Sequence, residues 1–134
     1  MTNPAPKIDI MRSPLGRVRG RGAARSGTAH WWAERITAAA LVPLTLWFIF
    51  VMVSLLGAKQ PVVAGFISHP FNAALLLALI AVTFQHAALG LQVVLEDYVP
   101  HPARRHLYVL AVQAACVVLG LTAAVSVIKL AVAI

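Results

Sequence analysis

Three long stretches without a charged residue divide the chain, and polar or proline-containing segments separate them. The stretches run from 36 to 56, from 71 to 95 and from 107 to 128. At about 1.5 Å per helical residue, the first of them covers roughly 30 Å, which is the thickness of the hydrocarbon core of a bilayer. The pattern predicts an all-α membrane protein with three transmembrane helices, spanning about 31–56, 71–97 and 105–131.

Prolines and short polar segments mark the ends of these spans. The segment GAKQP at 57–61 interrupts the apolar pattern after the first span, and Ser68-His69-Pro70 precedes the second. Proline suits the first turn of a helix and ends a helix that it follows. Pro100 and Pro102 therefore separate the second span from the third.

The composition agrees with a membrane protein and argues against nucleic-acid binding. Of the 134 residues, 60% are hydrophobic and 11% are charged, with a mean hydropathy of +0.84, which lies outside the range of soluble domains. The net charge of +7 comes largely from the region before the first span, which holds six of the eleven basic residues (Lys7, Arg12, Arg17, Arg19, Arg21 and Arg25). Such a cluster is typical of a membrane flank, so no nucleic-acid partner is expected.

The distribution of basic residues predicts the orientation. Arg104 and Arg105 lie in the loop between the second and third spans, whereas the loop after the first span carries only Lys59. The positive-inside rule then places the N-terminus and the second loop in the cytoplasm, and the C-terminus on the outer side. The N-terminal segment lacks the pattern of a cleavable signal and is expected to be retained.

Two regions are expected along the chain. Residues 1–25 contain proline, glycine and arginine without helical or strand periodicity, which predicts a basic, poorly ordered cytoplasmic tail that meets anionic lipid or a partner. Residues 26–134 form the three-span membrane domain.

Small residues recur at helical spacing in two spans. Cys116, Gly120 and Ala124 share one face of the third span, and Ala74 and Ala78 share a face of the second. Helices in lipid associate through such faces, and three spans enclose little interior, so we expect some of these faces to meet a partner chain. The single cysteine excludes a disulfide within the chain and a cysteine metal site.

His86 is the most unusual polar residue of the apolar spans. It lies 15 residues into the second span and 11 residues before Asp97, or about 16 Å from the cytoplasmic end of the helix. One interpretation is a hydrogen bond to a neighbouring helix. The other is an axial ligand of a haem iron, with Gly90 one turn away leaving room for a flat group. The remaining histidines lie near a surface, so a second iron ligand would come from another subunit.

The second span ends with Glu96, Asp97 and Tyr98. Acidic groups at a helix C-terminus are opposed by the helix dipole, so a compensating contact with Arg104, Arg105 or Arg35 is expected. Terminal charges and tyrosines are also ordinary interfacial anchors. The alternative is a quinone site in which Tyr98 donates a hydrogen bond to a carbonyl and Asp97 lies beside it.

The start of the first span offers two further candidates. His30 and Arg35 lie where anionic haem propionates or a quinone head would reach the same interface, while Trp31 and Trp32 are typical interfacial anchors. Pro43 is expected to kink this span.

Two stretches, AHWWAERITAAALVPL and QHAALGLQVVLEDYV, together resemble the hydrophobic membrane anchor subunit of succinate dehydrogenase, the smaller of its two anchor chains. The resemblance implies that His86 is an axial ligand of haem b and that Asp97 and Tyr98 border a ubiquinone site. It also implies three partners, namely a second anchor subunit of the cytochrome b type, an iron–sulfur subunit and a flavoprotein subunit. The chain itself would be a non-catalytic anchor in the bacterial inner membrane.

Two other functions remain open from the sequence. A related quinol:fumarate reductase would use the same electron path in reverse. A small transporter or structural subunit would use His86 and Asp97 as a proton path, although residues 73–81 of the same span supply no polar group for it.

Overall fold

The computed structural model describes residues 27–132, which form four helices. They are α2 (Gly27–Ser54), α3 (Gln60–Ser68), α4 (Pro70–Tyr98) and α5 (Pro102–Val132). Three of them, α2, α4 and α5, are long and apolar enough to cross a membrane. The predicted all-α fold with three long apolar helices is therefore confirmed. The tail expected at 1–25 lies outside the described residues.

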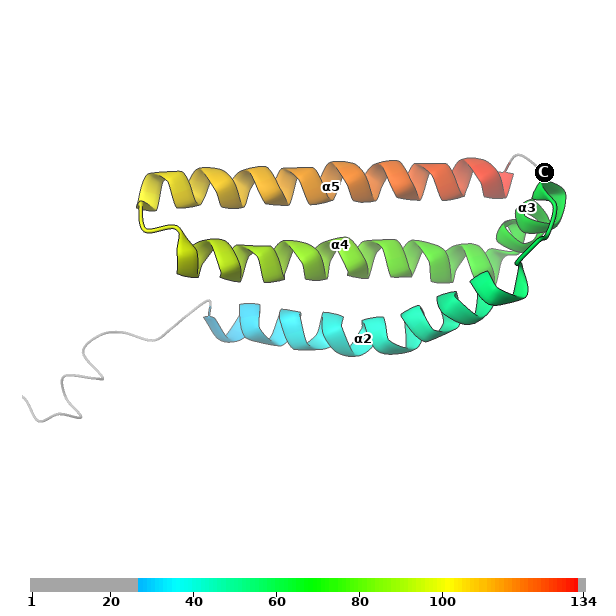
Figure 1. Cartoon of the computed structure of the whole chain (residues 1–134), viewed down its shortest axis with the longest axis horizontal. Coiled ribbons are helices and arrows are strands. Elements are labelled where there is room, and N and C mark those ends of the chain that lie inside the picture. The colour runs from blue at the N-terminus through cyan, green and yellow to red at the C-terminus, as the bar shows by residue number, and fades with distance from the viewer. Residues whose placement is uncertain (1–26, 133–134) are drawn as a thin grey trace, which may run out of the picture.

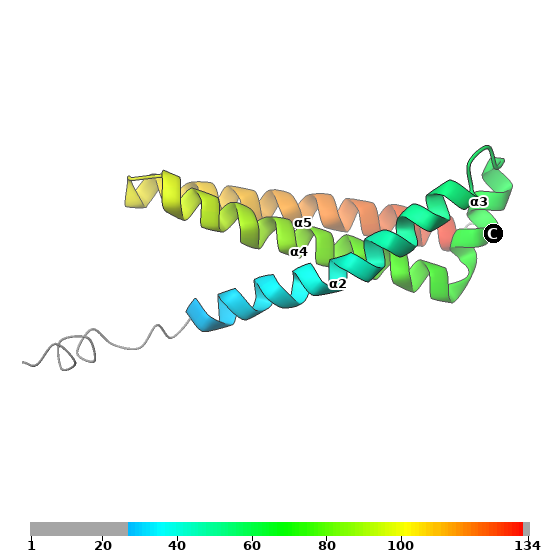
Figure 2. The same ribbon diagram turned by 60° about the horizontal axis from the view of Figure 1, so that its bottom comes forward.

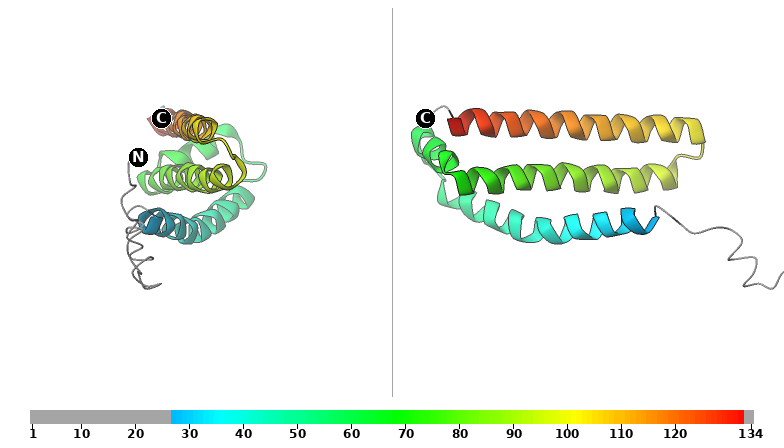
Figure 3. Two further views of the ribbon diagram at one scale, coloured as in Figure 1. Left: turned by 90° about the vertical axis from the view of Figure 1, so that its left-hand side faces the viewer. Right: turned by 180° about the vertical axis from the view of Figure 1, so that it is seen from behind.

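The three long helices lie in a row with α4 in the middle (Figure 1). Helix α4 packs against α5 on one side and against α2 on the other, and within residues 27–132 α2 and α5 do not meet. The end-on view in Figure 3 shows the same succession of α5, α4 and α2. The chain is thus a single layer of helices rather than a closed bundle.

A layer of this kind encloses almost no core. The buried hydrophobic residues are Val51, Ala64, Leu76 and Leu89, and none of the residues of α5 is buried. Large apolar side chains are exposed along all three long helices, for example Phe50 at 71% and Leu110 at 65%. These faces suit lipid tails or the helices of another chain, because either environment satisfies apolar groups.

The turn between α2 and α4 contains a short helix that the sequence analysis did not predict. Gly57 adopts a left-handed conformation with φ of 75°, and α3 begins next to Pro61, a residue suited to a first helical turn. Ala64 of α3 is buried, and the Asn72 side-chain amide of α4 donates to the Phe66 carbonyl at 2.9 Å. This contact satisfies a carbonyl at the end of α3 and fixes α3 over the end of the layer.

Helix α2 crosses α4 obliquely and bends along its length (Figure 2). Pro43 lies inside the helix and has no N–H to donate to the carbonyl of Ala39, which allows a bend at this point. The start of α2, the end of α4 and the start of α5 lie at one end of the layer, and α3 lies at the other (Figure 1). The end of the layer at which α2 begins and α4 ends therefore holds the residues that were predicted from the sequence to contact haem propionates and quinone.

Candidate functional site

His86 lies on the face of α4 that packs against α2. Its Nδ1 atom is 3.0 Å from the hydroxyl oxygen of Thr37, in a half-buried contact between the two helices. The interpretation of His86 as a hydrogen-bonding partner of a neighbouring helix is therefore confirmed for one ring nitrogen. Among residues 27–132, no hydrogen bond involves the other ring nitrogen, Nε2, which leaves this atom available to a metal.

Thr37 is anchored to its own helix. Its hydroxyl oxygen lies 2.8 Å from the Ala33 carbonyl and 3.0 Å from the Glu34 carbonyl, one helical turn earlier. Such back-bonding is common for threonine inside a helix, where the side chain donates to the preceding turn. The hydroxyl is thus held in place by its own helix, independently of its contact with His86. The sequence pattern alone does not indicate a role for Thr37.

His30 lies on the same face of α2 as Thr37. The two are seven positions apart, which is nearly two full turns or about 10 Å along the helix. The Nε2 atom of His30 is buried and has no hydrogen-bond partner among the described residues. A buried polar atom without a partner is unfavourable, so this nitrogen is suited to a ligand or subunit that completes the site.

Gly90 provides open space one turn from His86. A Cβ atom added at Gly90 would meet nothing within 4 Å, whereas one added at Gly120 would lie 3.2 Å from a ring carbon of Phe84. The α4 backbone beside His86 is therefore accessible to a flat ligand. A free imidazole nitrogen, a partnerless nitrogen at His30 and the open glycine together fit a haem group.

The described residues contain no group of three or more histidine, cysteine or acidic side chains that could hold a bare metal ion. An iron carried by a porphyrin needs only one axial side chain from each of two subunits. The single imidazole of His86 is thus compatible with haem.

Polar side chains at the end of α4 are open to the surroundings. Tyr98 is 82% exposed, and Glu96 and Asp97 are also exposed. The Glu96 carboxylate accepts a hydrogen bond of 2.8 Å from Gln92, and Arg105 donates to the Glu96 backbone carbonyl over 3.5 Å. The expected compensation at this helix end is therefore made by Arg105, through a terminal carbonyl and not through a carboxylate.

Arg35 does not take part in that compensation. Its guanidinium lies 5.5 Å from the centre of the Trp31 ring, and the two tryptophans, Trp31 and Trp32, pack edge to face with centroids 5.0 Å apart. A cation over an indole is a favourable contact at an interface. Arg35 is thus held at the start of α2, where it is exposed and available to an anionic group.

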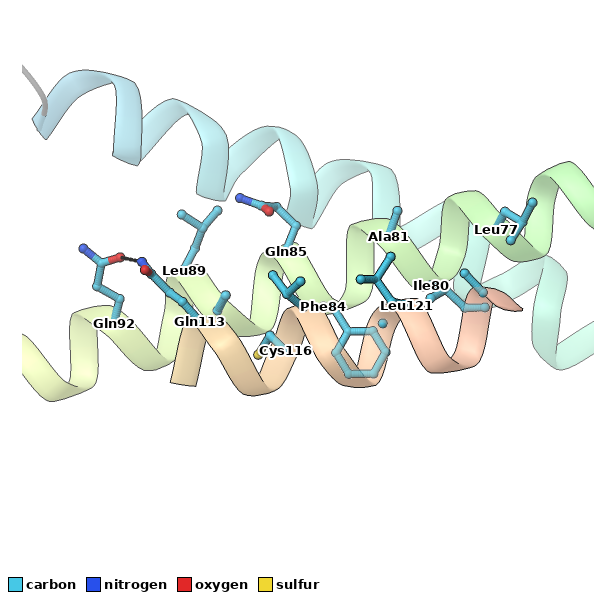
Figure 4. A pocket seen from close by; sticks show the side chains of 14 residues that line it. Leu77, Ile80, Ala81, Phe84, Gln85, Leu89, Gln92, Gln113, Cys116 and Leu121 are labelled. Carbon is cyan, nitrogen blue, oxygen red and sulfur yellow. Dashed lines mark hydrogen bonds between the residues drawn. The ribbon is translucent and has the colours of Figure 1, made fainter. Parts of the chain in front are cut away.

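A cavity lies on a different face of α4. It measures about 470 Å³ and is formed between α4 and α5 (Figure 4). At one end, the side-chain amide of Gln113 donates to that of Gln92 over 3.1 Å, as Figure 4 shows. His86, Asp97 and Tyr98 are not among the residues that line it. This cavity is therefore separate from the candidate haem position.

The small-residue face of α5 is used within the chain. Cys116, Gly120 and Ala124 line the cavity opposite α4, and Gly120 lies against the Phe84 ring. The expectation that small faces meet a partner chain does not describe this face, because α4 already packs against it. Ala74 and Ala78, in contrast, are exposed and available to another helix.

These features define a class of protein: an all-helical membrane subunit in which polar side chains meet between otherwise apolar helices. Residues 9–121 match the family model described as succinate dehydrogenase/fumarate reductase transmembrane subunit. The chain therefore belongs to this family, and within it to the hydrophobic membrane anchor subunits of succinate dehydrogenase.

Several curated relatives carry that description. The chain is 31% identical over 102 residues to the succinate dehydrogenase hydrophobic membrane anchor subunit of Rickettsia bellii, a match that covers 76% of this chain and 82% of the relative. The protein of the same description from Paracoccus denitrificans is 30% identical over 86 residues, a match that covers 64% of this chain and 67% of the relative. No solved structure matches the chain significantly.

Proposed function

We propose that this chain binds haem b jointly with a second membrane anchor subunit and contributes to the site at which ubiquinone is reduced. The observation that carries the proposal is His86, an imidazole deep within α4 whose Nδ1 is hydrogen-bonded to Thr37, while Nε2 has no hydrogen-bond partner among residues 27–132. A histidine ligand from each of two subunits leaves no open iron position, which suits electron transfer.

The surroundings of His86 support this role. Haem b supplies a one-electron redox centre when it is bound. His86 would hold the iron, Gly90 would leave room for the porphyrin plane, and His30 and Arg35 would meet its propionates. The partnerless nitrogen of His30 favours this assignment, because a propionate would accept its hydrogen bond.

The quinone role rests on the exposed end of α4. The Tyr98 hydroxyl, on a side chain that is 82% exposed, would donate a hydrogen bond to a quinone carbonyl. Asp97 precedes it and is exposed as well, so its carboxylate would take part in proton uptake from the aqueous side. Neither residue is committed to another described hydrogen bond, which leaves both available to a ligand.

The proposed location is the bacterial inner membrane, with the start of α2 and the loop before α5 in the cytoplasm. Arg35, Arg104 and Arg105 lie at that end of the layer, whereas Lys59 and Lys129 lie at the other. The six basic residues of the N-terminal segment precede α2 in the sequence, so the positive-inside rule favours the cytoplasmic side for the start of α2. Tyr98 would then face the iron–sulfur and flavoprotein subunits.

A second anchor subunit of the cytochrome b type is required by the same proposal. The layer of helices buries very few residues and offers a single histidine at depth. The partner would cover the exposed apolar faces and supply the second iron ligand. The flavoprotein would oxidise succinate and the iron–sulfur subunit would carry electrons, so this chain would be a non-catalytic part of the oxidoreductase.

The haem role is tested on the intact purified complex. Reduced-minus-oxidised spectra are recorded for the wild type, for His86→Ala and for His69→Ala, the last being a control because His69 is exposed and caps the opposite end of α4. We expect b-type bands in the wild type and the control, and their loss in His86→Ala. A wild-type complex without these bands would refute the haem role.

The quinone role is tested with Tyr98→Phe, which removes only the hydroxyl. Loss of a hydrogen bond worth about 1.4 kcal/mol would lower quinone reductase activity about tenfold. Succinate oxidation with an artificial acceptor that takes electrons from the soluble subunits should stay unchanged. Equal loss of both activities would count against a quinone site at Tyr98. Rates in the reverse direction, from quinol to fumarate, would separate the dehydrogenase from a reductase.

A further inference from the structure

We propose that Thr37 is a positioning residue that fixes the tautomer and the ring orientation of His86, so that Nε2 is free to bind iron. The inference deepens the proposed function and rests on the haem role of His86. It starts from the contact of 3.0 Å between the Thr37 hydroxyl oxygen and His86 Nδ1. No other described side chain is hydrogen-bonded to the His86 ring.

The tautomer follows from counting protons. The Thr37 hydroxyl has one proton, and three atoms compete for it: the Ala33 carbonyl at 2.8 Å, the Glu34 carbonyl at 3.0 Å and His86 Nδ1. Carbonyl oxygens only accept. If the hydroxyl donates to a carbonyl, Nδ1 must carry a proton and donate to the hydroxyl oxygen.

This arrangement makes more hydrogen bonds than the alternative. Nδ1–H donates to Thr37, and Thr37 donates to Ala33, which gives two bonds in a chain. If Thr37 instead donated to a bare Nδ1, the hydroxyl oxygen would receive nothing from the ring, and only one bond would remain. Consecutive hydrogen bonds also polarise one another in surroundings of low dielectric. The chain from His86 to Ala33 is therefore favoured.

The consequence lies on the other side of the ring. A neutral imidazole with its proton on Nδ1 carries a lone pair on Nε2, which is the state that a metal requires. The hydrogen bond also limits rotation of the ring, since Thr37 is itself bound to the preceding turn of α2. The His86 imidazole would thus already have the tautomer and the ring orientation that iron binding requires.

Thr37 should also affect the electronic properties of the bound iron. A ligand histidine that donates its second N–H to an acceptor becomes a stronger electron donor. Stronger donation stabilises the oxidised iron and lowers its reduction potential. Removing the acceptor should therefore shift the haem potential to more positive values, an effect that a purely packing role of Thr37 would not produce.

Thr45 offers a matched control on the same helix. Its hydroxyl donates to the Leu41 carbonyl at 2.6 Å and approaches the Val42 carbonyl at 3.1 Å, which repeats the local contacts of Thr37. It is exposed and has no hydrogen bond to α4 among the described residues. Thr45→Val therefore removes the same local bonding without touching His86.

The experiment uses the intact complex with Thr37→Val, Thr37→Ser and Thr45→Val. Redox potentiometry of the b-type bands gives the haem potential, and electron paramagnetic resonance of the oxidised complex gives the g values of the iron. We expect a more positive potential and altered g values in Thr37→Val. Thr37→Ser retains the hydroxyl and should restore both properties, and Thr45→Val should match the wild type.

Each outcome separates this inference from the function on which it rests. A wild type without b-type bands refutes the haem role itself, whereas a haem-containing Thr37→Val complex with unchanged potential and g values refutes only the inference. If Thr37→Val does not assemble, Thr37→Ala is measured in the same way, because it removes the hydroxyl without adding bulk. Failure of both to assemble would also overturn the inference, since Thr37 would then serve packing.

Discussion

The two sides of α4 differ in what holds their neighbours. Toward α5, the contacts are mainly apolar, and Gly120 lets the Phe84 ring approach closely. Toward α2, the contact includes a hydrogen bond between the half-buried side chains of Thr37 and His86, together with a buried His30 nitrogen that has no described partner. The same helix thus has one face suited to packing and another suited to ligand chemistry.

The difference follows from the solvent. In a membrane, an apolar side chain gains little free energy when it moves from lipid into a contact between helices. Helices therefore associate where small residues allow close contact. Polar side chains at depth are unfavourable and persist where they form specific contacts or carry a function. A substitution on the α5 side should therefore weaken assembly, and, if the proposed haem role is correct, one on the α2 side should lower the haem content.

The largest effect is expected from Gly120→Leu. An added Cβ would already lie 3.2 Å from the Phe84 ring, so a leucine would have to displace that ring, although Gly120 also borders the cavity between α4 and α5. Overpacking of this kind destabilises a protein by about 1–3 kcal/mol. Titration of the purified complex with sodium dodecyl sulfate should show earlier dissociation than in the wild type. Unchanged dissociation would mean that the α4–α5 contact is not tightly packed.

An intermediate effect is expected from the same substitution on the other face, Gly90→Leu. Nothing lies within 4 Å of an added Cβ at Gly90, so the described residues leave open space where the leucine side chain would begin. If the porphyrin occupies that space, the complex should assemble normally yet contain less haem per flavin, measured by pyridine haemochrome. A normal haem content would mean that the porphyrin does not lie against Gly90. It would also contradict the view that one face of α4 serves packing and the other serves ligand binding.

The smallest effect is expected at the polar contact on the α5 side. Gln113 and Gln92 hydrogen-bond across the two helices at 3.1 Å in an exposed position. A double-mutant cycle with Gln92→Leu and Gln113→Leu should give a coupling energy of about 0.6 kcal/mol, the average for such bonds in membrane helices. Dissociation in sodium dodecyl sulfate again provides the measurement. A coupling as large as the effect of Gly120→Leu would contradict the view that this side depends on apolar packing.

The sequence predicted the long helices because their signal is strong and local. An uncharged run of bilayer length has few alternatives, since a backbone in lipid must satisfy its own hydrogen bonds. The short helix α3 was missed because GAKQP indicates only a break, and the following apolar residues are too few to span a bilayer. Its position depends on the contact between Asn72 and the Phe66 carbonyl, which no local pattern encodes.

Thr37 was missed for a related reason. A threonine in an apolar helix is unremarkable by itself, and its partner His86 is 49 residues away. One signal was available: His30 and Thr37 share the face of α2 on which Glu34 also lies, and a polar stripe of this kind indicates that the face meets other protein and not lipid. The sequence could thus have indicated the face, although not the partner.

The sequence by itself determined the number of spans, their lengths and the depth of His86, because each depends on residues that are neighbours along one helix. Only the tertiary structure decided which faces meet: α4 in the middle of a layer, the small residues of α5 turned toward Phe84, and His86 turned toward Thr37. These choices depend on side chains that are distant in sequence and fit together only once the helices have packed, so helical periodicity alone does not specify them.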